Sequence, residues 1–305
     1  MAVKSDRGVI PDTSRSAGAY VRSLRPKQWT KNVLVFAALV FSHNLNDASA
    51  FVEVVIAFFC FCAASSAVYV LNDLRDRESD RLHPVKRFRP IAAGQVPVSH
   101  ASVMGLALAA FALGVGFSLA PMFAALLAGY MLLNIAYSLY LKHQVILDVF
   151  SISAGFVLRA AGGAVVLSVP ISPWLYVCTV VLALFVGFGK RRNEIVLLED
   201  GAGGHRKNLD EYSAPLLDQF IVVTAGATVM AYSLYTFVAE NLPENHLMMS
   251  TIPFVLYGIF RYLYLVHQKQ EGGAPEQVIL TDRPLLGAVF FWGVLSVVIL
   301  YGPWA

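Results

Sequence analysis

Charged residues are scarce in this chain of 305 residues. Asp, Glu, Lys and Arg make up only 14% of it and hydrophobic residues 57%, whereas about 25% charged residues is usual in a soluble domain. Apolar stretches near the length needed to cross a bilayer, about 17–25 residues, recur along the sequence. The composition therefore predicts an all-α, polytopic protein embedded in the lipid bilayer, and we expect no nucleic-acid partner.

Cysteine is rare as well, and the histidines form no metal-binding pattern. The three cysteines, Cys60, Cys62 and Cys178, all lie in apolar stretches and lack the spacing of metal ligands. The histidines share no ligand spacing either, so the sequence predicts no zinc site. We expect the cysteines to pack in the protein core.

Nine apolar stretches are candidates for transmembrane helices. The first is the weakest, because the apolar core from Val33 to Phe41 is short and has polar residues at its ends. Residues 1–23 are a polar, basic tail, so we expect residues 24–305 to form a single membrane domain. The predicted spans are 33–45, 50–71, 101–119, 122–140, 146–168, 173–189, 214–239, 248–266 and 285–302.

Lysine and arginine are missing from every second loop between these spans. If the amino terminus is cytoplasmic, the segments on that side hold 21 of the 23 Lys and Arg residues, and the opposite loops hold none. Cytoplasmic loops are enriched in these residues in membrane proteins. We therefore expect a multi-pass protein of the inner (plasma) membrane with its carboxyl terminus outside. The basic segments are 1–32, 72–100, 141–145, 190–213 and 267–284.

Acidic residues follow the second span at helical spacing. In a helix that continues through them, Asn72, Asp73, Asp76 and Asp80 fall within about 100° of one another. Like charges so placed destabilise a helix unless a cation neutralises them, and Mg²⁺ binds carboxylates together with substrate phosphates. The spacing predicts that these four residues bind Mg²⁺ and a diphosphate. The alternative is a solvated helix end in which the acids pair with nearby arginines, namely Arg75, Arg77 and Arg81.

The pattern Asn-Asp-x-x-Asp-x-x-x-Asp from Asn72 to Asp80 is followed by Arg-x-Arg-Pro-x-x-x-Gly from Arg87 to Gly94. Together they resemble the first aspartate-rich motif of the UbiA-type membrane prenyltransferases. The resemblance implies a fold of nine transmembrane helices. It also implies that Asp73, Asp76 and Asp80 are catalytic and face the cytoplasm.

Four further sequence stretches resemble one group within this superfamily in particular. LRPKQWTKN from Leu24, HPVKRFRPIAAG from His83, LKHQ from Leu141 and GKRRNE from Gly189 are similar to the decaprenyl-phosphate phosphoribosyltransferases, a group within this superfamily. The resemblance implies transfer of 5-phosphoribose from phosphoribosyl diphosphate to decaprenyl or another polyprenyl phosphate. The product would be the precursor of the lipid-linked arabinose donor for cell-wall arabinan.

The stretch from Lys190 to Glu194 departs from the wider superfamily, in which most prenyl-diphosphate users carry a second aspartate-rich motif here. A basic stretch with one acid suits an anionic ribose phosphate or lipid phosphate, although membrane anchoring alone would also explain the bases. Arg159 lies near the middle of a span, where a charge is costly. We expect it to meet a phosphate, with a buried structural ion pair as the alternative.

We expect basic and polar residues around the acidic face to bind the diphosphate, the ribose phosphate or the lipid phosphate. Some of them, including Tyr137, Lys142 and Lys31, could equally be interfacial anchors. The predicted substrate-binding residues are Lys31, Asn72, Arg77, Arg87, Arg89, Tyr137, Lys142, Arg159, Lys190, Arg191 and Glu194.

Two other functions remain open from the sequence. A UbiA-type enzyme that moves a prenyl group from a prenyl diphosphate to an aromatic acceptor would use the same acidic face. A multi-span transporter of an anionic metabolite could use Arg159 and Asp148 along its path. The odd number of spans and the lack of a visible inverted repeat disfavour the transporter. The sequence does not indicate an oligomeric state.

Overall fold

The computed structural model describes residues 16–199, 209, 211–270, 272–273 and 275–303. Every regular element in these residues is a helix. The elements are α1 (Ala17–Leu24), η1 (Pro26–Phe36), α2 (Ala37–Phe41), α3 (Ala48–Arg75), α4 (Arg77–Leu82), η2 (Lys86–Phe88), α5 (Val98–Leu119), α6 (Pro121–Leu139), η3 (Leu141–His143), α7 (Leu147–Val166), α8 (Pro173–Glu199), α9 (Ala214–Val238), η5 (Leu247–Thr251), α10 (Ile252–Gln268), α11 (Pro275–Thr281) and α12 (Arg283–Tyr301), where η denotes a 3₁₀-helix.

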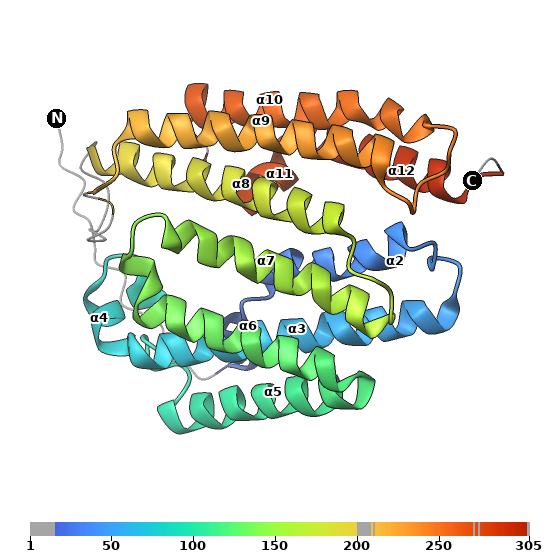
Figure 1. Cartoon of the computed structure of the whole chain (residues 1–305). Coiled ribbons are helices and arrows are strands. Elements are labelled where there is room, and N and C mark those ends of the chain that lie inside the picture. The colour runs from blue at the N-terminus through green and yellow to red at the C-terminus, as the bar shows by residue number, and fades with distance from the viewer. Residues whose placement is uncertain (1–15, 200–208, 210, 271, 274, 304–305) are drawn as a thin grey trace.

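Eight helical segments within these residues are long and apolar enough to cross a membrane. They correspond to the second to ninth predicted spans, and α8 continues to Glu199, beyond its predicted end at residue 189. The prediction of an all-α, multi-pass membrane protein is confirmed. The long helices run side by side from one end of the molecule to the other (Figure 1).

The first predicted span has a different form from the one expected. Residues 33–45 do not form one α-helix, because η1 continues to Phe36 and only Ala37–Phe41 is α-helical. A 3₁₀-helix rises about 2.0 Å per residue, compared with about 1.5 Å in an α-helix, so η1 and α2 reach further than their residue count suggests. Helix α1 also lies within the segment expected to be a polar tail, and it packs against the end of α3 through Ala19 and Val70.

The helices pack as two halves that share α7. In one half, Val54 and Phe61 of α3 pack with Phe123 and Leu127 of α6. Helices α8, α9, α10 and α12 form the other half around a separate apolar core. In the most apolar stretch of 18 residues in each span, only 11% of the residues of α5 and 17% of those of α6 are buried, compared with 67% in α3. Helix α3 is therefore central, whereas only a small share of α5 and α6 is fully buried.

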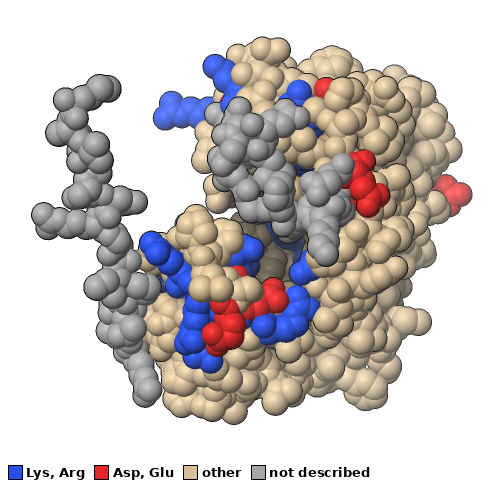
Figure 2. Space-filling model, turned by 90° about the vertical axis from the view of Figure 1, so that its left-hand side faces the viewer, with Lys and Arg blue, Asp and Glu red and all other residues tan. Residues whose placement is uncertain are grey.

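At one end of the bundle, on the left in Figure 1, lie the end of α3 with α4, the turn between α6 and α7, the end of α8 and the start of α9. At this end Asp218 of α9 contacts Arg192 of α8 and His267 of α10. At the opposite end the hydroxyl group of Tyr301 donates to the Val40 carbonyl oxygen. Seen from the first end, Lys, Arg, Asp and Glu side chains gather around a hollow in the surface (Figure 2). The helix packing therefore assembles the predicted site from loops far apart in the sequence.

Candidate active site

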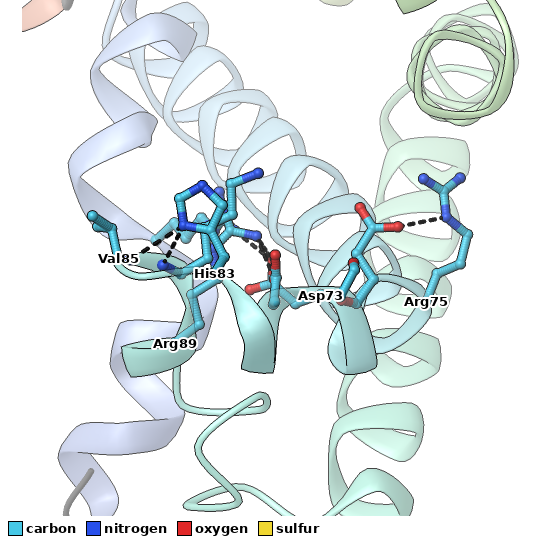
Figure 3. Close-up of polar contacts among 10 residues, drawn as sticks. Asp73, Arg75, His83, Val85 and Arg89 are labelled. Atoms are coloured by element: carbon cyan, nitrogen blue, oxygen red, sulfur yellow. Dashed lines mark hydrogen bonds and ion pairs between the residues drawn. The ribbon is translucent and has the colours of Figure 1, made fainter. Parts of the chain in front are cut away.

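Two of the three predicted catalytic acids, Asp73 of α3 and Asp80 of α4, are buried and share one arginine. The side chains of Asp73 and Asp80 are 3% and 4% exposed. One nitrogen of Arg89, Nη1, donates to Asp73 Oδ1 at 3.1 Å and to Asp80 Oδ2 at 2.7 Å. Arg25 also donates to Asp73 Oδ1, at 2.5 Å, and its guanidinium lies over the Tyr69 ring. Figure 3 shows Asp73 and Arg89 facing each other.

The third acid, Asp76, pairs with a different arginine. Helix α3 ends at Arg75 and α4 begins at Arg77, and Asp76 between them has a ψ angle of 7°. Asp76 Oδ1 accepts a hydrogen bond of 2.9 Å from Arg75 Nε. The prediction of one uninterrupted helix through the motif is therefore wrong at Asp76, where a single turn residue separates α3 from α4. The Asp76 amide still donates to the Asn72 carbonyl oxygen, and the Asp80 amide to the Asp76 carbonyl oxygen.

The alternative prediction was a solvated helix end in which Arg75, Arg77 and Arg81 pair with the acids of the motif. The structure shows these pairs only in part. Arg75 contacts Asp76, but Arg77 and Arg81 contact the exposed Glu78 instead. The buried acids are neutralised from elsewhere in the chain, by Arg25 and Arg89. Asn72 is half-buried at the same end of α3, and its backbone carbonyl accepts from the Asp76 amide.

His83 stabilises the turn that places Arg89 beside the acids. The Nδ1 atom of His83 accepts from the backbone amides of Val85 and Lys86, at 3.1 and 3.2 Å, as Figure 3 shows. Arg87 is half-buried in this turn and its guanidinium lies over the Phe88 ring. Gly94 ends the motif with φ +78°, a conformation that glycine adopts without steric cost.

The last turn of α6 joins the acidic cluster to α8, and the connection to α7 follows it. Arg75 donates to the Ser138 carbonyl oxygen at 3.2 Å, and the neighbouring Tyr137 hydroxyl accepts from Arg191 at 3.2 Å. Lys142 lies in η3 of this connection. Ile146 at its end has φ +69°, which is rare for a β-branched residue. A strained residue of this kind indicates that its surroundings fix the turn.

Arg191 is the centre of a second cluster, in which Arg191 and Asp148 are buried. Its side chain is 1% exposed and donates to Asp148 Oδ2 at 2.6 Å and to Glu194 Oε2 at 2.5 Å. The Tyr212 hydroxyl donates to Asp148 Oδ1 and accepts from the Ile146 amide. Burial raises the pKa of Tyr212, so this phenol keeps its proton.

The prediction that Arg191 binds substrate is at odds with this arrangement, because its guanidinium is enclosed by protein partners. Glu194, with 26% of its side chain exposed, is accessible. Lys190 is half-buried at the same end of α8.

Arg159 lies apart from both clusters, inside the bundle. It donates to Asn32 Oδ1, to the Tyr130 hydroxyl and to the Gly155 carbonyl oxygen, at 2.7, 2.8 and 2.7 Å. These partners are neutral, and Asp148 pairs with Arg191 instead, so the alternative of a buried ion pair is wrong for the described contacts. Lys31, next to Asn32 in η1, is half-buried.

The sequence interpretation missed three residues that organise the site. Arg25 lies in the LRPKQWTKN string, where a base before a proline at the membrane edge was the available signal. Asp148 was considered only as a residue along the path of a possible transporter. Tyr212 gave no signal, because its partners Ile146 and Asp148 are more than 60 residues away in the sequence.

The sequence profile of the UbiA prenyltransferase family matches residues 33–293 of this chain. The chain belongs to this family. Curated relatives include the decaprenyl-phosphate phosphoribosyltransferases of Corynebacterium glutamicum, 36% identical over 93% of this chain and 87% of the relative, and of Mycobacterium tuberculosis, 36% identical over 92% and 94%. The prediction of a transferase is confirmed, and the transporter alternative has no support.

Solved structures share the UbiA fold of this chain. A UbiA homologue from Archaeoglobus fulgidus bound to GPP and Mg²⁺ matches with a TM-score of 0.67 at 19% identity, over 93% of this chain and 97% of that one. A digeranylgeranylglyceryl phosphate synthase matches with a TM-score of 0.66 at 15% identity, over 92% and 98%. At these identities the likeness shows the fold alone.

The acids of this UbiA-family chain fit a magnesium ion by their chemistry. Asp73 Oδ2, Asp76 Oδ2 and Asp80 Oδ1 accept no hydrogen bond from the residues that the structure describes, and oxygen atoms are the ligands that Mg²⁺ prefers. Within the described ranges, however, no three acidic, histidine or cysteine side chains converge as a preformed cage. The chain therefore offers an open site, in which substrate phosphates and water would complete the coordination.

Proposed function

We propose that this protein transfers 5-phosphoribose from phosphoribosyl diphosphate to decaprenyl phosphate, or to another polyprenyl phosphate, and releases diphosphate. The observation that carries the proposal is the name shared by relatives that are 35–36% identical over 89–93% of the chain. The product would enter the synthesis of the lipid-linked arabinose donor for cell-wall arabinan. The acids and arginines at one end of the bundle support a reaction between two phosphorylated substrates.

In this proposal, Asp73, Asp76 and Asp80, with Asn72, hold Mg²⁺ and the diphosphate of the donor. Bound Mg²⁺ would neutralise the charge that develops on the departing diphosphate. Arg89 lies between two of these carboxylates and its side chain is 30% exposed, so it can also donate to a phosphate through charge-assisted hydrogen bonds. We propose that further basic residues also bind the substrate phosphates through their positive charge, namely Arg77, Arg87, Lys142, Lys190 and Lys31.

The acceptor needs no strong base in this reaction. A phosphate monoester has its second ionisation near pH 6, about −1.5 to −2 in charge at pH 7, so the lipid phosphate is already a nucleophile. The chain then accelerates transfer by holding the two phosphates near each other and by stabilising charge. Tyr137 and Glu194 lie near the turn that links the two clusters and are proposed to orient the donor.

The membrane arrangement belongs to the same proposal. We propose nine crossings of the inner membrane, with η1 and α2 forming the first, and a single membrane domain over residues 24–305. The amino terminus and the site would face the cytoplasm and the carboxyl terminus the outside. A polyprenyl tail leaves the bilayer at a cost of about 0.8 kcal/mol per CH₂ group, so the tail would stay in lipid while its phosphate reaches the charged end.

A second candidate is prenyl transfer from a prenyl diphosphate to an aromatic acceptor. The observation in its favour is the solved relative of the same fold bound to GPP and Mg²⁺. The basic stretch from Lys190 to Glu194, with Arg191 between two acids, disfavours this reaction.

Both candidates are tested by lipid mass spectrometry of products made by the detergent-purified protein. One tube contains Mg²⁺, phosphoribosyl diphosphate and decaprenyl phosphate, and another contains Mg²⁺, a prenyl diphosphate and 4-hydroxybenzoate. We expect a lipid that gains one phosphoribosyl unit in the first tube only, with at least a roughly 100-fold loss in Asp76→Ala and after chelation of Mg²⁺. Glu78→Ala, which removes an exposed acid two residues away, is the matched control. A prenylated aromatic as the sole product would replace our assignment with the second candidate.

A further inference from the structure

The site contains two pairs of carboxylates that are each bridged by one arginine. Arg89 bridges Asp73 and Asp80, and Arg191 bridges Asp148 and Glu194. In both pairs the acids come from separate helices. The contacts are similar too, because each guanidinium lies within 2.5–3.1 Å of both carboxylates.

The two arginines differ in how easily a ligand could displace them from the carboxylates. The Arg89 side chain is 30% exposed on a loop, so a metal ion or a phosphate can displace it from the acids. The Arg191 side chain is 1% exposed on α8 and also donates to the Tyr137 hydroxyl. Its partner Asp148 is fully buried and is held by the Tyr212 hydroxyl as well. Displacing Arg191 would take a cation away from the fully buried Asp148 carboxylate, which is strongly unfavourable.

We propose that Arg191 is a built-in cation that occupies the place of a metal ion between Asp148 and Glu194. Divalent metal binding is then confined to the cluster of Asp73, Asp76 and Asp80. Arg191 is a positioning residue in this scheme, since it holds Glu194 at the edge of the site and ties α6, α7 and α8 together. The inference rests on the proposed function only in taking the first cluster as the Mg²⁺ site.

The proposal predicts a gain of metal binding when Arg191 is removed. In Arg191→Ala the guanidinium between the two carboxylates is gone, and a divalent ion with water ligands can take its place. In Arg191→Lys a positive charge remains, so no metal ion should be gained. In the double variant Arg191→Ala with Asp148→Asn one of the two ligands is lost, and the gain should disappear.

The measurement counts Mn²⁺ ions bound to the full-length protein in detergent, by electron paramagnetic resonance of free Mn²⁺ in the presence of inorganic diphosphate. We expect one more ion per chain in Arg191→Ala than in the wild type, and no gain in the lysine and double variants. Mn²⁺ should also raise the thermal unfolding midpoint of Arg191→Ala but not of the double variant. A folded Arg191→Ala protein that gains no ion would overturn the proposal.

Glu194→Gln provides a test that does not depend on the folding of Arg191→Ala. Its Mn²⁺ count in the wild-type background should equal that of the wild type, whereas Asp80→Asn should lower the count. Loss of an ion in Glu194→Gln would mean that Glu194 is a metal ligand, and the built-in cation would be wrong. Because neither ribose donor nor lipid is present, failure of phosphoribosyl transfer would leave these results interpretable.

Discussion

At the scale of single residues, Arg159 shows how a buried charge is accommodated. An arginine at the centre of a transmembrane helix costs about 2.5–3.5 kcal/mol on insertion scales, so the sequence predicts a polar partner. The structure supplies Asn32, Tyr130 and a backbone carbonyl, together with the rings of Tyr130 and Phe156 at 4.7 and 5.3 Å. A packing role explains these contacts, and phosphate binding by Arg159 stays a prediction.

Replacing this arginine should separate the two roles. We expect Arg159→Met to lower the free energy of unfolding by about 1–3 kcal/mol, because Asn32 and Tyr130 lose a buried donor. Thermal unfolding in detergent measures this loss, and Arg81→Met, at an exposed arginine, is the control that should change little. Normal thermal stability of Arg159→Met with lost transferase activity would instead support contact with a phosphate.

The residues of the acidic cluster were largely predictable, but their pairing was not. Spacing alone identified Asp73, Asp76 and Asp80, and the motif added Arg89. At Asp76, Arg75 contacts its sequence neighbour and also the Ser138 carbonyl oxygen, 63 positions away. No local pattern encodes the second contact. Arg25 reaches Asp73 across 48 positions, so its role depends on how η1 and α3 pack.

At the scale of elements, η1 is the segment that sequence periodicity describes least well. Apolar spacing cannot distinguish a 3₁₀-helix from an α-helix over a short stretch, and runs of 3₁₀-helix longer than about four residues are uncommon. The packing partner of η1 is α7 at Gly163, where an added Cβ would lie 2.0 Å from the Val35 carbonyl oxygen. The backbones of η1 and α7 therefore touch directly.

We expect Gly163→Ala to destabilise the protein by about 1–3 kcal/mol, the usual cost of overpacking a core. The steric partner is backbone, so it cannot rotate away as a side chain would. Gly114→Ala in α5 is the matched control, because a Cβ added there would have no neighbour within 4 Å and alanine favours a helix. Thermal unfolding of both variants measures the difference, and equal midpoints would show that η1 can shift without cost.

At the scale of the whole molecule, the distribution of Lys and Arg anticipated how the loops gather. The described helix ends and turns around α4, η3 and the end of α8 lie at one end of the bundle (Figure 1), and Lys, Arg, Asp and Glu side chains gather on that face (Figure 2). The eight long helices followed from hydrophobic length alone. The division into two halves around α7 did not, because nearly every helix is apolar on most sides and the sequence gives few clues to its neighbours.

Cysteine labelling in intact cells should establish the proposed orientation. In a chain with Cys60, Cys62 and Cys178 replaced by alanine, a membrane-impermeant maleimide should label Glu244→Cys but not Leu82→Cys, because both positions are exposed and lie at opposite ends of the bundle. Leu82→Cys should react after the cells are opened. Labelling of Leu82→Cys in intact cells would reverse the orientation.

The ion pair between Arg25 and Asp73 has a consequence for biosynthesis. Arg25 precedes η1 and Asp73 lies near the end of α3, so their contact joins the two ends of the first helical hairpin. A nascent chain can make this contact as soon as α3 has entered the membrane, well before the later helices are translated. The pair would then hold the weakly apolar first segment against α3 while the remainder of the protein is inserted.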